Sequence, residues 1–170
     1  MAMTAGGVAL GAGLISVVKV SAEFEDAIIT AAAVTGKTGE AFDSAKEKIS
    51  ELAKHLGGTT VFTARQAANA FVALGRKGID VSRLSVEQLQ PIMDLAVGQN
   101  YDLEKSAQVL TQTMKSYGLE FSDVGRIADT FTVATTSSDA TIQKLSHSMP
   151  IVAATAKAAG IPLEELVAVL

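Results

Sequence analysis

Glycine-centred helix ends recur at a nearly constant interval along this chain. Gly78, Gly118 and Gly160 each follow an apolar-periodic stretch and precede a small apolar cluster. The separations are 118 − 78 = 40 residues and 160 − 118 = 42 residues. A glycine just after a helix takes up a left-handed conformation, and the apolar residues that follow it can fold back onto the helix just finished. The three glycines therefore predict helix ends at regular positions.

Weaker turn signals fall between these glycines, at Gly58, at Gly98 and in the polar cluster 135–139. The chain thus has a helix-breaking element about every 20 residues, which leaves room for a helix of about 12 to 16 residues and a short turn. We predict an all-α fold of consecutive helical hairpins, either compact or solenoid-like. The breakers are too evenly spread over 170 residues to mark a boundary between two domains.

Apolar residues recur at helical spacing in each stretch between breakers, which predicts the buried face of each helix. The predicted core residues are Phe24, Ala27, Ile28 and Ala31; Ala45, Ile49, Leu52, Ala53 and Leu56; Ala67, Ala70, Phe71 and Leu74; Ile92, Leu95 and Ala96; Leu103, Ala107, Leu110, Met114 and Tyr117; Val124, Ile127, Ala128 and Phe131; Ile142, Leu145 and Met149.

Three helix boundaries follow from glycine and proline. The second helix, over residues 43–56, is expected to stop at Gly57 and Gly58. Pro91 cannot donate a hydrogen bond to a helical ladder, so either a helix begins near Gln90 after a short turn or the helix bends there, and we favour the new start. For the same reason Pro150 should kink or divide the helix that contains it.

Composition argues against several classes of function. The formal net charge is −4, and the longest run of basic residues is Arg76-Lys77, so direct reading of nucleic acid is not expected. The chain has no cysteine, which excludes a disulfide framework and a thiolate metal site and fits a reducing compartment.

Residues 1–20 differ from the rest because residues 5–18 are apolar and rich in glycine. Fourteen residues fall short of the roughly 20 that a helix needs to cross a bilayer. We interpret residues 1–20 as an apolar N-terminal helix or a disordered lead-in, with membrane contact as an alternative. Residues 21–170 form the predicted helical core domain.

A phosphate-binding loop is the first candidate site, because Gly36-Lys37-Thr38 resembles the end of such a motif. The full motif needs a glycine five residues before Gly36, where this chain has Ala31, and a preceding strand, where the pattern is helical. An ordinary turn between helices is the better interpretation.

The two histidines are the next candidates. His55 lies in the last turn of a predicted helix, and His147 lies between Ser146 and Ser148 with Asp139 nearby. A hydrolytic triad would need a nucleophile on a strand-to-helix turn, and no such turn accompanies these residues. Both histidines are interpreted as surface or partly buried helix residues.

Two acidic pairs, Glu25-Asp26 and Glu164-Glu165, fall at the beginnings of predicted helices, where carboxylates interact favourably with the helix dipole. Adjacent positions on a helix do not share a face, so neither pair forms a catalytic dyad. The sequence therefore predicts no catalytic, cofactor-binding or metal-binding residue, and no enzyme.

The order of segments from Phe24 to Leu170 resembles the N-terminal region of phage tail tape measure proteins of siphophages and myophages. The segments that carry the resemblance are FEDAIITAAAVTG, ELAKHLGGTTVFTARQAANAFVALGRKGID, IMDLAVGQNYDLEKSAQVL, YGLEFSDVGRIADTFTVATTSSDATIQKLSHSMP and AAGIPLEELVAVL.

The resemblance implies a structural protein of the virion that lies in the lumen of the tail tube, helps set tail length and leaves during genome ejection. It implies partners in the tail tube, the tail tip or baseplate and the tail assembly chaperones, with self-association as a further expectation and the bacterial cytoplasm as the place of assembly. Residues 21–170 would be the tape measure core domain, truncated at its C-terminus, because the long helical rod that measures length is absent from them.

Two other functions fit the sequence less well. One is a generic α-helical scaffold or adaptor module from another system. The other is a membrane-perturbing helical protein that acts through residues 1–20.

Overall fold

The computed structural model describes residues 21–170, and every regular element among them is helical, as predicted. Residues 21–33 form the first of these helices. The elements that follow are α2 (Glu40–Thr59), α3 (Ala64–Arg76), the 3₁₀ turn η1 (Val81–Arg83), α4 (Val86–Gly98), α5 (Leu103–Tyr117), the 3₁₀ turn η2 (Phe121–Asp123), α6 (Val124–Ser137), α7 (Ile142–Ala158) and α8 (Leu163–Val169).

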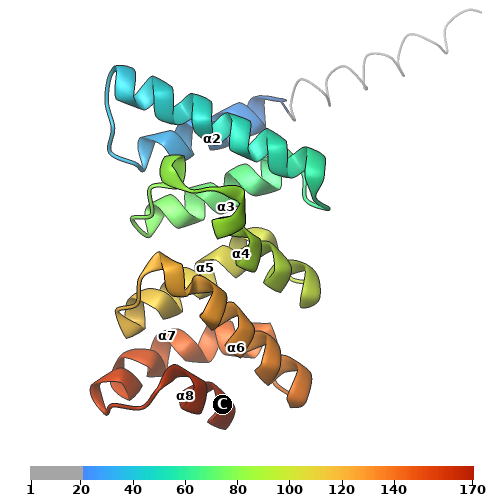
Figure 1. The fold of residues 1–170 in the computed structure, drawn as a ribbon, viewed down its shortest axis with the longest axis vertical. Coiled ribbons are helices and arrows are strands. Elements are labelled where there is room, and N and C mark those ends of the chain that lie inside the picture. Colours follow the sequence, from blue (N-terminus) through green and yellow to red (C-terminus); the bar gives the residue numbers. More distant parts are fainter. Residues whose placement is uncertain (1–20) are drawn as a thin grey trace, which may run out of the picture.

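The helices stack as hairpins in two rows along the long axis of the molecule (Figure 1). The odd row contains residues 21–33, α3, α5 and α7, with α5 packed between α3 and α7. The even row contains α2, α4, α6 and α8, where α6 packs against α4 and α8. Helix α2 packs against η1, the 3₁₀ turn that precedes α4 in the chain. The arrangement is therefore the solenoid-like alternative of the predicted fold.

The three predicted glycine turns all have the expected conformation. The φ angles of Gly78, Gly118 and Gly160 are 79°, 65° and 75°. In each turn the N–H of the next residue donates to a carbonyl oxygen five residues earlier: Ile79 to Leu74 at 3.2 Å, Leu119 to Met114 at 2.8 Å and Ile161 to Ala156 at 2.9 Å. These hydrogen bonds satisfy carbonyl groups that the helix end leaves free, which explains why each helix stops there.

A fourth left-handed glycine turn lies at Gly36, with a φ angle of 72°. Here the N–H of the next residue, Lys37, donates to the Thr35 hydroxyl oxygen at 3.4 Å instead of to a carbonyl oxygen five residues earlier. Gly36 precedes Gly78 by 78 − 36 = 42 residues, so it continues the spacing toward the N-terminus. The sequence predicted an ordinary turn between helices here, and the structure confirms it. Because the residue after Gly36 is Lys37 rather than an apolar residue, Gly36 was not recognised as one of the recurring glycines. Each of the four hairpins in residues 21–170 therefore turns at a left-handed glycine.

The predicted apolar faces form one continuous core. Its largest fully buried side chains include Phe71 of α3 and Phe131 of α6. Phe24, Leu52 and Tyr117 are only partly buried, but they pack against this core. Helical periodicity thus identified the buried faces correctly.

The prediction that Gly57 and Gly58 stop the second helix is wrong, because α2 continues through both and ends at Thr59. Gly57 has a different role. A Cβ atom on Gly57 would lie 2.5 Å from the backbone nitrogen of Ala64, the first residue of α3. The missing side chain therefore permits a close approach between α2 and α3.

The predicted restart near Gln90 is also wrong, because α4 is continuous from Val86 to Gly98 with Pro91 inside it. The helix begins earlier because Ser85 and Gln88 form a reciprocal capping box, each side chain bonding the other residue's backbone N–H. Pro91 removes one hydrogen bond from the ladder but does not end the helix. Similarly, Pro150 lies inside α7 without dividing it.

The predictions for residues 1–20, including membrane contact, lie outside the described residues. Within residues 21–170, no helix combines the length and the apolar character needed to span a bilayer.

Candidate functional site

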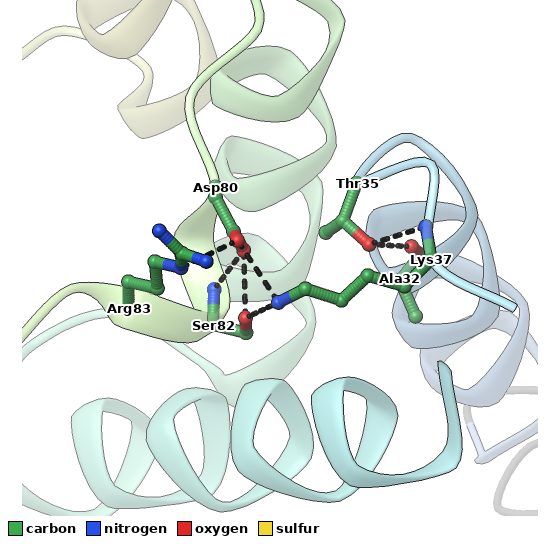
Figure 2. Close-up of polar contacts among 6 residues, drawn as sticks. All are labelled: Ala32, Thr35, Lys37, Asp80, Ser82 and Arg83. Carbon is green, nitrogen blue, oxygen red and sulfur yellow. Dashed lines mark hydrogen bonds and ion pairs between the residues drawn. The ribbon is translucent and has the colours of Figure 1, made fainter. Parts of the chain in front are cut away.

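Lys37, the cation of the candidate phosphate loop, lies in the turn between residues 21–33 and α2. Its ammonium nitrogen is 2.9 Å from Oδ2 of Asp80 and 2.5 Å from Oγ of Ser82 (Figure 2). Both partners belong to the segment that leads into and forms η1, in the second hairpin. The group that a phosphate loop would offer to a nucleotide instead joins the first hairpin to the second.

Asp80 is the centre of this polar cluster. Its Oδ1 accepts hydrogen bonds from the backbone N–H of Ser82 at 3.2 Å and from the Ser82 hydroxyl at 2.6 Å, and its Oδ2 lies 3.2 Å from Nε of Arg83. Burial raises the pKa of the Asp80 carboxyl, but the Ser82 hydrogen bonds and the charge of Lys37 outweigh it, so the pKa lies below its ordinary value. Asp80 is therefore held as a carboxylate.

The residues around His147 do not assemble into a catalytic group. The Nδ1 atom of His147 lies 2.8 Å from the carbonyl oxygen of Gln143, which also accepts a hydrogen bond from the Ser146 hydroxyl. The Ser148 hydroxyl donates to the carbonyl oxygen of Lys144. All three side chains thus bond to their own helix, α7.

His55 lies on the exposed side of α2, far along the chain from these residues. Among residues 21–170, no three histidine, aspartate or glutamate side chains gather in a way that could hold a metal ion.

The acidic pairs contribute to contacts between helices. Glu25 lies 3.2 Å from the ammonium of Lys46 in α2. Glu164 at the start of α8 forms an ion pair with Arg126 of α6. A hydrogen bond from its own backbone N–H, together with Arg126, holds the pKa of Glu164 below its ordinary value. The Glu164–Arg126 pair joins the third hairpin to the fourth.

Neighbouring hairpins are joined by further polar contacts. Arg65 of α3 pairs with Glu23 in the first helix, 42 residues earlier. The ammonium of Lys77 donates to Oε1 of Gln112 at 2.6 Å, which connects the end of α3 to α5. These polar side chains therefore act as links between successive units of the stack.

Two of the open hollows on the described surface combine charged residues from several helices. One, of about 760 Å³, lies among α6, α7 and α8 at the end of the stack, and Arg126, Asp129 and Glu164 contribute to its lining. The other, of about 700 Å³, crosses α3, α5 and α7, and Arg76, Lys77 and Lys105 are among its residues. The sequence patterns predicted neither hollow, because each combines residues from several hairpins.

The fold and these contacts define a structural protein built from stacked helical hairpins. The chain belongs to a family described as phage-related minor tail protein, whose match covers residues 50–170. It is therefore a phage tail protein, and thus a component of the virion. No solved structure matches the chain.

One curated relative extends the similarity toward the N-terminus. The chain is 28% identical over 151 residues to a protein named Tape measure protein from Pneumococcus phage Dp-1. The matched region is 89% of this chain but only 13% of that relative. Together the two comparisons show that the chain is a tape measure-like protein.

Proposed function

We propose that this chain is the head region of a tape measure protein and helps set tail length during tail assembly. The observation that supports this role is the similarity to a tape measure protein across 89% of the chain, which spans a small part of a much longer relative. In this role the head region lies with the rest of the protein in the tail tube and is released during genome ejection.

The geometry of the stack favours a head rather than the ruler itself. Packed helices lie about 8–10 Å apart, so each hairpin of about 40 residues adds only about 10 Å to the length of the stack. A single extended helix of 40 residues would span about 60 Å. A two-row stack therefore spans much less length per residue than an extended helix does. Its exposed faces suit binding to partners better than the measurement of length.

The partners in this proposal are proteins at one end of the tail. The head region folds in the bacterial cytoplasm, where tail assembly chaperones bind the tape measure protein, and docks on the tail tip or baseplate before tube rings assemble around the remainder. The hollows on the stack provide surfaces for such docking, and self-association at that end would fit the same role.

An in-frame deletion of the codons for residues 21–170 in the phage that carries this gene tests the proposal. Electron microscopy of the lysate would show few or no finished tails. The control deletes 150 codons from elsewhere in the same gene, and this should yield tails that are shorter in proportion to the deletion.

Finished tails in normal numbers after the head deletion would contradict the proposal, whether their length is unchanged or reduced in proportion. In the first case the region has no role in tail assembly. In the second case it acts as one more part of the ruler.

A further inference from the structure

The hollow on the odd row has an unusual charge for this protein. We define the basic hollow by Arg76 and Lys77 at the end of α3 and Lys105, Gln108 and Gln112 of α5. Its lining includes no aspartate or glutamate, although the protein has a net charge of −4. The basic hollow is therefore a local concentration of positive charge on an acidic molecule.

The cations of the basic hollow are not neutralised within the described part of the chain. Arg76, Lys77 and Lys105 take no part in an ion pair among residues 21–170. Three cations that line one hollow without an ion-pair partner favour an anion bound there.

The uncharged groups of the basic hollow suit a peptide. Oε1 of Gln112 accepts a hydrogen bond from Lys77, so the amide nitrogen of Gln112 remains as a donor for a peptide carbonyl. The small apolar side chains of Ala73 and Val109 also line the basic hollow. The volume of about 700 Å³ is in the range of binding clefts that enclose a short ligand segment.

We propose that the basic hollow binds an extended acidic segment of a partner protein, with carboxylates on Arg76 and Lys105. This inference does not depend on the role in tail assembly, because it rests on the charges and donors of the hollow alone. It assigns a partner chemistry to one face of the stack, the odd row.

Acidic residues beside the basic hollow favour a peptide over nucleic acid. Glu104 accepts a hydrogen bond from Gln108 at 3.0 Å, and a neighbouring hollow that shares Arg76 is lined by Glu23, Asp26 and Glu104. A nucleic acid is a stiff polyanion with a negative charge at every phosphate, so it would hold some phosphates against these carboxylates. The side chains of a short flexible peptide can rotate, so that its carboxylates meet the cations and turn away from the acidic residues.

Fluorescence anisotropy with a labelled hexaglutamate peptide at low ionic strength tests the inference. The protein should bind hexaglutamate, and the double variant Arg76→Gln/Lys105→Gln should weaken that binding by about fivefold or more. The matched control, Lys48→Gln/Lys54→Gln on α2, changes the net charge equally and should leave binding within about twofold. Neither pair of side chains makes a hydrogen bond or ion pair among residues 21–170, so both variants should fold, which circular dichroism checks.

Three outcomes would overturn the inference. The first is no binding of hexaglutamate by the unaltered protein, and the second is equal weakening by the two double variants. The third is tighter binding of a short DNA duplex than of hexaglutamate, lost in the Arg76→Gln/Lys105→Gln variant, which would make the occupant a nucleic acid.

Discussion

The ammonium group of Lys157 in α7 lies too close to Gly118 for a Cβ atom on Gly118 to fit beside it. Gly118 ends α5, where the carbonyl groups carry the negative end of the helix dipole, so a lysine from the next hairpin is well placed there. One hairpin earlier, the ammonium group of Lys115 lies near Gly78, 3.5 Å from the position that a Cβ atom would take there. A glycine turn and a lysine from the following unit thus fit together at two successive levels of the stack.

Replacing Gly118 should therefore destabilise the protein for two reasons. In Gly118→Val, a β-branched residue must adopt a φ angle near 65°, and its side chain must displace Lys157. We expect a loss of about 1–3 kcal/mol in the free energy of unfolding, measured by urea denaturation. Gly98→Val is the control, because a Cβ there has open space, and it should change stability by less than about 0.5 kcal/mol. An unchanged melting temperature for Gly118→Val would refute this account of the turn.

The Lys37–Asp80 contact should make stability depend on pH in the acid range. The pKa of Asp80 in the folded protein lies below that of the unfolded chain, so the unfolded state binds more protons as the solution is acidified. The stabilisation is complete above the unfolded pKa of about 4 and is lost as the pH falls through the lower folded value. Asp80→Asn should cost about 1 kcal/mol at neutral pH and progressively less below pH of about 4.

Urea denaturation of the Asp80→Asn variant at several pH values would measure this effect. The control is Glu47→Gln, which alters an exposed carboxylate of α2 that makes no ion pair among residues 21–170. If the two variants showed the same pH profile, Asp80 would not be the carboxylate responsible.

The sequence predicted features that depend on local physics. Apolar residues at helical spacing identified the buried faces, and the glycines that precede apolar residues identified the turns at Gly78, Gly118 and Gly160. These signals lie within one or two helical turns of the residues they concern. The helical hairpins and their order could therefore be predicted without knowledge of the neighbours of each helix.

Features that depend on distant residues could not be predicted in this way. Gly57 was predicted to stop a helix, but its role is to permit a close approach to Ala64 of α3. That approach exists only once α2 has packed on α3, so the local sequence does not reveal it. The partner of Lys37, Asp80, lies 43 residues away in the chain. The basic hollow combines three helices of the odd row. To predict these three features, one must know how far apart neighbouring helices lie in the stack, and the periodicity of apolar residues does not give that distance.

The core of α6 offers a direct test of the stack. Phe131 is fully buried, while Val133, two residues later on the same helix, is 63% exposed. Phe131→Ala should lower the free energy of unfolding by about 3–5 kcal/mol, because it leaves a cavity where α6 packs on its neighbours. Val133→Ala should stay within about 0.5 kcal/mol. Similar losses for the two variants in thermal denaturation would show that α6 is not packed in this way.

The two glycines of α2 should respond in opposite directions to the same substitution. A Cβ atom on Gly57 would lie 2.5 Å from the backbone nitrogen of Ala64, whereas a Cβ on Gly58 would have nothing within 4 Å. Gly57→Ala should therefore force α2 and α3 apart and cost about 1–3 kcal/mol. Gly58→Ala should instead stabilise the protein by about 0.5–1 kcal/mol, because alanine favours the helix and narrows the unfolded ensemble. Melting temperatures that shift in the same direction for both variants would contradict the close contact between α2 and α3, since only that contact distinguishes the two positions.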